Sequence, residues 1–243
     1  MTGDIPTGEQ LRLITAAAHE LKTPLTIIAH LASVLDDSSV ILTADELQQT
    51  AKRIQYTAER TLRMVQDLTL GYRLSQMDQL SLALELEPVN AMQIAEEVAH
   101  ELTPFALARE QSIIVEPARR QYLVVAHRRL LHSVFFNLID NSVRHNPPKT
   151  DIRLSAQKRP GLVRVHVQDT GAGIDRSDFN GLASRLGNQS QAFNQGGNSS
   201  SGLGLYISGQ LAMAMGGQLG LARSGGGTDF RVDLVQSLQL GFL

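Results

Sequence analysis

An uninterrupted heptad pattern near the N-terminus constrains the fold of this chain more than any other feature. Apolar residues recur at alternating intervals of three and four along one helical face: Leu11, Ile14, Ala18, Leu21, Leu25, Ile28, Ala32 and Leu35. A repeat with this period keeps one seam of an α-helix facing a partner helix along its whole length. The pattern therefore predicts a long amphipathic helix that packs against other helices.

A second helix of the same kind is expected after a short break, "DDSSVIL". Thr43 and Glu46 have the spacing of a capping box, which marks a helix N-terminus. The second apolar seam runs through Leu47, Ala51, Ile54, Ala58, Thr61 (or Leu62), Val65, Leu68 and Tyr72. Two such helices form a hairpin with one uncovered apolar stripe, and a second copy covers it most simply in a four-helix bundle. We expect a homodimer built on a domain over residues 1–86.

Pro24 lies inside the first helical pattern without disturbing its apolar spacing. A proline in a helix removes one hydrogen bond and crowds the carbonyl four residues earlier, here that of Glu20, at a cost of about 3 kcal/mol. His19 and Thr23 fall outside the seam, one turn apart on one exposed face. An exposed histidine and glutamate often have no role, but a costly proline beside them favours a functional site.

The composition is that of an ordinary soluble protein. Its 243 residues suffice for two domains, and a net charge of −2 gives no reason to expect binding to nucleic acid or to an anionic membrane. The absence of cysteine excludes disulfides, thiol catalysis and cysteine-ligated zinc. No apolar run approaches the roughly 18–20 residues of a membrane helix, and no signal peptide precedes the first helix. We expect a cytoplasmic segment without membrane contact, which a longer protein could anchor through segments absent here.

After Pro88 the pattern changes to short strands mixed with three helices. Helices are expected over 92–110, 128–145 and 202–217, and strands over 112–117, 122–127, 151–157, 162–169, 217–224 and 227–235. Within one strand, Val163, Val165 and Val167 alternate onto one face, as in a half-buried strand. The pattern predicts a second domain over residues 87–243 with a two-layer α/β sandwich fold.

Two asparagines on the helix over 128–145 suit nucleotide chemistry. Asn137 and Asn141 lie four residues apart on one face, with Asp140 between them. Amide oxygens are suitable ligands for a Mg²⁺ ion that also keeps water and substrate phosphate ligands. The spacing alone is weak evidence, because asparagines also cap helices and fill cores.

A second candidate stretch, "DTGAGI", begins with Asp169 at the end of a strand. Its carboxylate can accept a hydrogen bond from an adenine amino group, while Gly171 and Gly173 allow a base to approach the backbone. An ordinary hairpin turn explains the same residues equally well.

The third candidate stretch opens a helix after a run rich in glycine, asparagine and serine. Backbone N–H groups at a helix N-terminus favour phosphate, which makes Gly202, Leu203 and Gly204 candidates. Glycine-rich helix starts are common, so this signal is also weak by itself. The two commonest phosphate-binding motifs, GxxxxGK[ST] and a strand-linked GxGxxG, are absent.

In this order, "HELKTPL", "NLIDNSVRH", "DTGAGI" and "GLGLYI" resemble the motifs of the sensor histidine kinases of two-component signalling. The resemblance covers nearly the whole chain. It implies a dimerisation and histidine-phosphotransfer hairpin, followed by a catalytic ATP-binding domain of the GHKL type. On this resemblance the protein uses ATP and Mg²⁺ to phosphorylate its own histidine, then transfers the phosphoryl group to the receiver domain of a response regulator.

The resemblance also implies roles for residues of the hairpin. His19 resembles the phosphoacceptor, and Glu20 resembles the acid/base partner that orients its imidazole. Thr23 completes an E-x-x-T pattern found in family members that also dephosphorylate their regulator. A threonine that is merely exposed remains the alternative for Thr23.

In the second domain, Asn137 and Asn141 resemble the magnesium-binding pair, with Asn141 the firmer ligand. Arg144 stands at a basic position that usually meets phosphate, and His145 at one that is often aromatic beside the adenine. Asp169 resembles the adenine-specificity aspartate. The two glycine boxes of the resemblance contain Gly171, Gly173, Gly202, Leu203 and Gly204.

The sequence departs from the family between the two glycine boxes. The expected aromatic cluster before the lid is missing, and only Phe179 and Phe193 remain. Leu182 and Leu186 could substitute for the cluster, or Arg185 could supply a γ-phosphate contact. His127 stands where an acidic residue is common. The atypical lid keeps one alternative open, a dimeric nucleotide-binding scaffold that regulates a partner kinase. A GHKL ATPase of the chaperone or mismatch-repair type would lack the phosphoacceptor hairpin.

Overall fold

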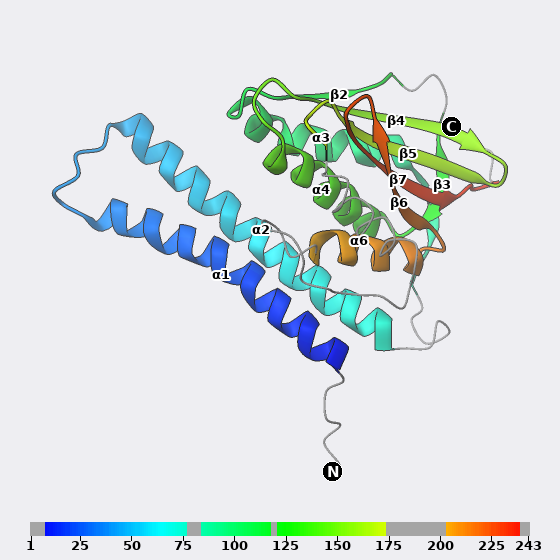
Figure 1. Ribbon diagram of the computed structural model, residues 1–243, viewed down its shortest axis with the longest axis horizontal. Coiled ribbons are helices and arrows are strands. Elements are labelled where there is room, and N and C mark those ends of the chain that lie inside the picture. The colour runs from blue at the N-terminus through cyan, green and yellow to red at the C-terminus, as the bar shows by residue number, and fades with distance from the viewer. Residues whose placement is uncertain (1–7, 77–83, 118–120, 174–202, 239–243) are drawn as a thin grey trace, which may run out of the picture. The chain divides into compact units, whose positions relative to one another are not determined.

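The structure is a computed structural model that describes residues 8–76, 84–117, 121–173 and 203–238 (Figure 1). The chain divides into two compact units. The first contains Met1–Tyr72 and Phe193–Gly204, and the second contains the mixed α/β region, Arg73–Ala192 and Leu205–Leu243. The predicted fold class, a helical hairpin followed by an α/β domain, is confirmed. The domain limits of 1–86 and 87–243 remain predictions.

The first unit is an antiparallel hairpin of α1 (Gly8–Asp36) and α2 (Ala44–Gln76) (Figure 1). The predicted capping box is confirmed. The N–H and the hydroxyl of Thr43 each donate to Oε2 of Glu46 at 2.8 Å, and the N–H of Glu46 donates back to Oγ1 of Thr43 at 3.2 Å. The Thr43 N–H, followed by its hydroxyl, holds the pKa of Glu46 below its usual value. These reciprocal bonds explain why α2 begins where the sequence predicts.

Many of the predicted seam residues are exposed in a single copy of the hairpin. Leu25 on α1 is 56% exposed and Leu62 on α2 is 60% exposed. Thr61, the other candidate for that seam position, is buried. Apolar side chains that stay exposed at heptad spacing form the kind of surface that a partner covers.

The second unit is built on a five-stranded sheet with strand order β2-β4-β5-β7-β6. These strands are β2 (Ser112–Val115), β4 (Asp151–Arg159), β5 (Leu162–Asp169), β6 (Gln218–Ser224) and β7 (Gly227–Val235). Strands β2 and β4 are parallel, and the other neighbours are antiparallel. A separate antiparallel pair joins β1 (Glu87–Asn90) to β3 (Leu123–Ala126).

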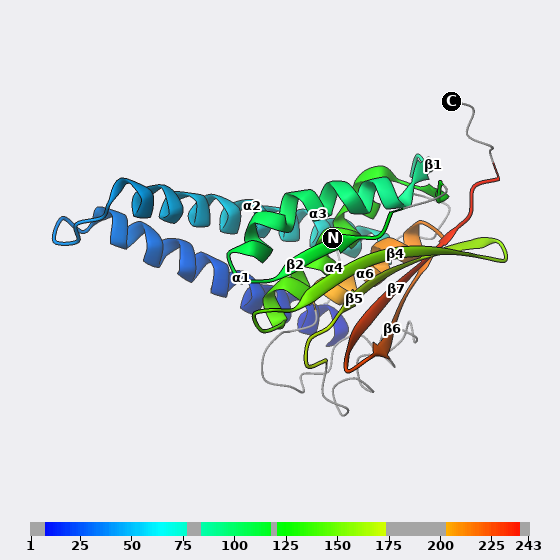
Figure 2. The same cartoon turned by 90° about the horizontal axis from the view of Figure 1, so that it is seen from above.

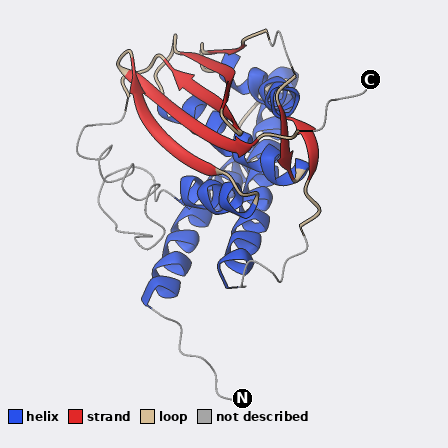
Figure 3. Cartoon of the chain, turned by 90° about the vertical axis from the view of Figure 1, so that its right-hand side faces the viewer, coloured by secondary structure: helices blue, strands red, loops and turns tan. Residues whose placement is uncertain are grey.

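Three helices cover one face of this sheet: α3 (Ala91–Leu107), α4 (Arg128–His145) and α6 (Leu203–Ala214) (Figures 2 and 3). The predicted alternation in β5 is confirmed, because Val163, Val165 and Val167 are all fully buried. Phe135 and Leu131 of α4 are also fully buried. Close packing of these side chains between the two layers forms the core of the unit.

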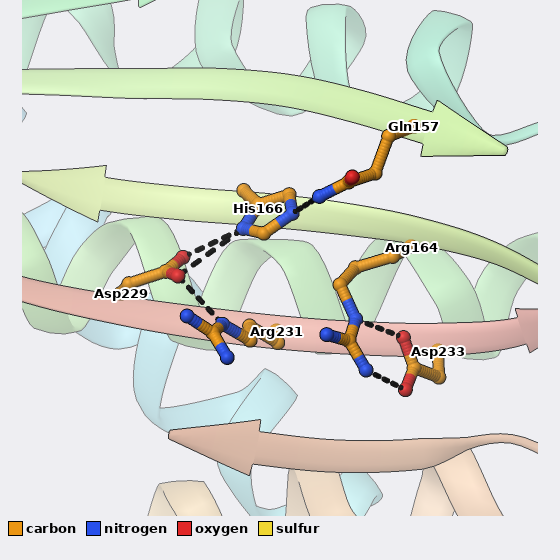
Figure 4. Close-up of polar contacts among 6 residues, drawn as sticks. All are labelled: Gln157, Arg164, His166, Asp229, Arg231 and Asp233. Carbon is orange, nitrogen blue, oxygen red and sulfur yellow. Dashed lines mark hydrogen bonds and ion pairs between the residues drawn. The ribbon is translucent and has the colours of Figure 1, made fainter. Parts of the chain in front are cut away.

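The opposite face of the sheet carries paired charges (Figure 4). Arg164 on β5 donates two hydrogen bonds of 2.6 Å to the carboxylate of Asp233, its cross-strand neighbour on β7. This fork raises the pKa of the Arg164 guanidinium above its usual value. Nearby, Nδ1 of His166 lies 2.9 Å from Oδ1 of Asp229, while Nε of Arg231 donates to the other oxygen of Asp229 at 2.7 Å. Such cross-strand pairs specify the register of β5 against β7.

Some element ends differ from the prediction. The helix expected over 92–110 ends at Leu107 in a turn, in which Glu110 adopts a φ of 56°. Strand β1 was not predicted, because a four-residue strand that contains Pro88 has too few residues to show a period. Helix α4 and strands β5 and β7 begin and end at the predicted residues.

Candidate functional site

Helix α4 places three of the predicted site residues on one face. Asn137 and Asn141 are half-buried, and Arg144 is exposed in the last turn. Nη2 of Arg144 donates a hydrogen bond to Oδ1 of Asn141 at 3.1 Å, and Nε of Arg144 donates to Oδ2 of Asp140 at 3.1 Å. The structure therefore brings Asn141 and Arg144 into direct contact, with Asn137 one turn earlier along the helix.

The C-terminal turn of α4 is held by residues that precede β2. Nε2 of Gln111 donates to the carbonyl of Asn146 at 2.8 Å. Nη2 of Arg109 donates to the carbonyl of Arg144 at 3.2 Å. These contacts join segments 35 residues apart in the sequence, and they fix the turn that carries Arg144 and the exposed His145.

Asp169 is the last residue of β5 and is almost completely buried. Its Oδ1 accepts hydrogen bonds from the backbone N–H groups of Gly171 and Thr228, both at 3.1 Å. No described residue donates a hydrogen bond to its second oxygen, Oδ2. A carboxylate oriented through one oxygen can offer the other to a ligand, and this geometry suits a ligand with an N–H donor.

The glycines after Asp169 are required by the packing of the protein itself. A Cβ on Gly171 would lie 1.7 Å from Oδ1 of Asn146. Gly173 has a φ of +71°, and a Cβ there would lie 2.4 Å from the carbonyl oxygen of Gly226. Close approach by the chain's own atoms therefore accounts for both glycines, whereas the prediction invoked close approach by a base.

Thr228 is a candidate site residue that the sequence analysis missed. It is buried at the start of β7, and its N–H helps to orient Asp169 from 59 residues away. The antiparallel pairing of β5 with β7 brings the two residues together. The stretch "GGGTDF" signals only a turn followed by a strand, so a polar residue directly after the glycines was the one available clue.

The predicted residues of the hairpin lie together on α1. His19 and Thr23 are exposed and Glu20 is half-buried. Helix α1 continues through Pro24 without a break. A second mid-helix proline, Pro104, lies in α3, a helix that contains no predicted site residue, so a proline by itself is a poor marker of a functional position.

The second glycine box lies only partly within the described residues. Helix α6 begins at Leu203, which is fully buried and therefore contributes to packing. Among the described residues, none has an atom within 4 Å of the position that a Cβ on Gly204 would take. Outside the described residues lie Gly202 and the lid residues Phe179, Arg185 and Phe193.

The donor atoms that α4 offers to a metal ion are the amide oxygens of Asn137 and Asn141. In the part of the chain that the structure describes, no three His, Cys, Asp or Glu side chains come together to hold a metal. The half-buried amide of Asn141 offers an oxygen with two lone pairs, one of which accepts the Arg144 hydrogen bond. A Mg²⁺ ion that takes one or two protein ligands and completes its shell with phosphate and water fits this donor set.

Comparison with known proteins identifies both units. Residues 9–76 match the family described as His Kinase A (phospho-acceptor) domain. Residues 126–237 match the family described as Histidine kinase-, DNA gyrase B-, and HSP90-like ATPase. The two matches correspond to the hairpin and to most of the α/β unit.

Individual relatives give the same result. The chain is 31% identical to the sensor protein SphS of Synechococcus elongatus, over 94% of the chain and 55% of SphS. The crystal structure of full-length ShkA in complex with AMPPNP shares the fold with a TM-score of 0.60 and 25% identity, covering 93% of this chain and 46% of ShkA. The histidine kinase ThkA, solved in complex with the response regulator protein TrrA, gives a TM-score of 0.58 at 19% identity, covering 90% of this chain and 60% of that one.

The chain spans about half the length of the curated relatives it matches, 55% in the case of SphS. None of the described helices is both long enough and apolar enough to cross a membrane. The hairpin matches a phosphoacceptor domain and the α/β unit matches an ATP-binding domain, in the order found in sensor kinases. The chain therefore belongs to the sensor histidine kinases of two-component signalling and carries their kinase core.

Proposed function

We propose that this chain transfers the γ-phosphoryl group of ATP to His19 and then to an aspartate of a response regulator. The observation that carries the proposal is the exposed position of His19 beside Glu20, on a hairpin that precedes an ATPase-like domain in the same chain. An exposed imidazole is accessible both to an ATP-bound domain and to a partner protein.

In the first step, a ring nitrogen of His19 attacks the γ-phosphorus, and the bond to the bridging oxygen breaks to release ADP. The free ring nitrogen of a neutral imidazole is nucleophilic without further activation. The ring needs orientation and a place for its proton. Glu20, the neighbour of His19, supplies both as the acid/base partner.

Asp169 recognises the adenine through Oδ2, which accepts a hydrogen bond from the amino group while Oδ1 stays bound to two backbone N–H groups. The exposed His145 lies beside the base. Arg144 and the start of α6, with Gly202, Leu203 and Gly204, contact the phosphates. The bound AMPPNP of ShkA supports a nucleotide as the ligand.

Asn141, with help from Asn137, holds a Mg²⁺ ion through the amide oxygen. When bound, the ion supplies positive charge that stabilises the transferred phosphoryl group. The amide oxygen of Asn141 and the cationic Arg144 make direct contact in this structure, so the chain places its own positive charge at the same position.

The exposed seam of the hairpin supports a homodimer, and the exposed His19–Thr23 face supports docking of a receiver domain. The complex of ThkA with TrrA supports a response regulator as the partner. We place the kinase core in the cytoplasm. Thr23 adds a regulator phosphatase activity by holding a water in line with the aspartyl phosphate.

The test is incubation of the full chain with Mg²⁺ and γ-labelled ATP. We expect label that is lost in acid and kept in base, as for a phosphohistidine, and that disappears in His19→Ala. His30→Ala is the matched control, because His30 is also an exposed histidine on α1. Label that survives His19→Ala would assign the phosphate to another residue. Nucleotide binding without any label in the wild-type chain would favour the scaffold alternative.

A further inference from the structure

The contact between Arg144 and Asn141 involves the same oxygen that the proposed function gives to the metal. Nη2 of Arg144 lies 3.1 Å from Oδ1 of Asn141. Within the described ranges this is the one hydrogen bond of the Asn141 side chain. The guanidinium of Arg144 therefore places a positive charge at the oxygen that a metal ion would need.

Asp140 accepts a hydrogen bond from a neighbouring nitrogen of the same guanidinium. Nε of Arg144 donates to Oδ2 of Asp140 at 3.1 Å, one helical turn back. The carboxylate is almost buried, with 5% of its side chain exposed, whereas 37% of the Arg144 side chain is exposed. The buried carboxylate of Asp140 is thus held in place by its surroundings, and the more exposed guanidinium of Arg144 can move around it.

Arg144 and a divalent cation cannot share Asn141. An amide oxygen has two lone pairs, so geometry alone would allow two partners. A guanidinium and a metal ion bound to one oxygen would lie only a few ångströms apart, and like charges at that separation repel strongly at a partly buried site. Occupation of Asn141 by one cation therefore opposes occupation by the other.

We propose that Arg144 acts as a competing cation at Asn141, whose guanidinium must leave the amide oxygen before a metal ion binds there. This inference rests on the proposed function, because it takes Asn141 as the metal ligand. Asp140 is the positioning residue. It keeps Nε of Arg144 close while Nη2 leaves Asn141, and the freed edge of the guanidinium then turns toward a phosphate oxygen.

The arrangement couples the metal to the nucleotide. A phosphate group gives the displaced guanidinium a new partner, so the metal replaces Arg144 more easily when nucleotide is present. Without nucleotide, the metal must compete against the full Arg144–Asn141 contact. The chain then has a low affinity for free Mg²⁺ and binds metal and nucleotide together.

The test measures the affinity of the full chain for ADP by calorimetry over a series of free Mg²⁺ concentrations. The readout is the Mg²⁺ concentration at which half of the metal-dependent gain in ADP affinity is reached. We expect Arg144→Gln to lower this midpoint at least fivefold, equivalent to about 1 kcal/mol, because no cation has to be displaced. Arg109→Gln is the matched control. Arg109 contacts the carbonyl of Arg144, so this substitution removes the same charge at a nearby position.

We expect Arg109→Gln to leave the midpoint within twofold of the wild-type value. Equal shifts in both variants would overturn the proposal, because they would reflect the general loss of positive charge. An unchanged or higher midpoint in Arg144→Gln would also overturn it and leave Arg144 as a phosphate contact only. If ADP binding by the wild-type chain did not depend on Mg²⁺, the metal assignment of Asn141 would fail, and this proposal would fail with it.

Discussion

The ATPase-like domain buries the apolar side chains of its helices, whereas the hairpin leaves many of its apolar side chains exposed. In the ATPase-like domain, Phe135, Leu138 and Ile139 of α4 have no exposed surface. In the hairpin, Ile14 remains 60% exposed and Leu47 51% exposed, although both belong to the predicted seams. One region completes its core within a single chain, and the other leaves apolar side chains of its helices exposed in a single chain.

This difference separates two sources of stability. A core closed within one chain gives a free energy of unfolding that is independent of protein concentration. A stripe buried by a second copy gives a stability that rises with concentration through mass action. We therefore expect the ATPase-like domain to unfold as an independent cooperative unit and the hairpin to depend on dimerisation.

The largest expected effect comes from Phe135→Ala in the closed core. Removing a fully buried phenylalanine should lower the free energy of unfolding of the ATPase-like domain by about 3–5 kcal/mol, because a cavity remains. Denaturant unfolding monitored by ADP binding measures this loss, and sedimentation measures the dimer. Leu107→Ala, at an exposed position of α3, serves as the control. Dissociation of the dimer in Phe135→Ala would show that the two units are not independent.

Leu25→Asp tests the open seam of the hairpin. Full burial of a leucine contributes about 1.5–3 kcal/mol, and each dimer has two copies, so we expect the dissociation constant to rise roughly a hundredfold or more. Analytical ultracentrifugation gives this constant directly. Ile41→Asp is the control, because Ile41 is 95% exposed but lies in the loop outside the seams. A dimer unaffected by Leu25→Asp would place the association surface elsewhere.

Asp169→Asn should affect the ATPase-like domain and spare the hairpin. Loss of one charge-assisted hydrogen bond, worth about 1.5–3 kcal/mol, should weaken ATP binding at least tenfold. Calorimetric titration with ATP measures the change, and the dimer should remain intact. Asp151→Asn is the control, because it removes a carboxylate charge from the same domain at a residue whose partner is the hydroxyl of Ser112. Undiminished ATP affinity in Asp169→Asn would remove this residue from the site.

Thr23→Ala probes a role confined to the hairpin. We expect autophosphorylation of His19 to stay within a few-fold, while dephosphorylation of the regulator slows at least tenfold, about 1.4 kcal/mol in barrier. Thr26→Ala provides the control, because the Thr26 hydroxyl donates to the carbonyl of Lys22 on the same helix. Equal losses of both activities would reduce Thr23 to a supporting role in the helix.

The smallest effect concerns the cap of α2 and its dependence on pH. The pKa of Glu46 is lowered by the Thr43 N–H and hydroxyl, so its contribution to stability is present at neutral pH. It is lost as the pH falls from the ordinary range of a glutamate carboxyl through the lowered pKa. Thr43→Ala removes the hydroxyl that donates to the carboxylate, so it should lower the hairpin melting temperature more at pH 7 than at a pH low enough to protonate Glu46. A loss of melting temperature in Thr43→Ala that is the same at both pH values would show that Glu46 does not act through its charge.

Ser112→Ala offers the parallel test in the other unit, where the Ser112 hydroxyl lowers the pKa of Asp151.

The elements that the sequence predicted best have a strong period of their own. Helix α4 and strand β5 show one apolar face over their whole length, and both begin and end at the predicted residues. The cap at Thr43 and Glu46 was predictable because its hydrogen bonds join residues three apart. Strand β1 was missed because its four residues gain their conformation from pairing with β3.

The candidate site likewise has residues that the sequence predicted and contacts that it did not. The order of motifs along the chain was sufficient to place Asn137, Asn141 and Asp169 among the candidates and to indicate the family. The contact of Thr228 with Asp169 was not visible, because it depends on the register between β5 and β7. Likewise, the spacing of Asn141 and Arg144 allowed a contact but did not specify the atoms that meet.

The sequence by itself therefore determined the two long helices, the alternating strands and the identity of the chemical groups. These depend on local periodicity and on side-chain type, which are properties of neighbouring residues. The tertiary structure alone decided which oxygen of Asp169 is occupied and which cation meets Asn141. Such choices follow from strand register and from side-chain conformation, and both depend on packing between segments that the linear spacing does not encode.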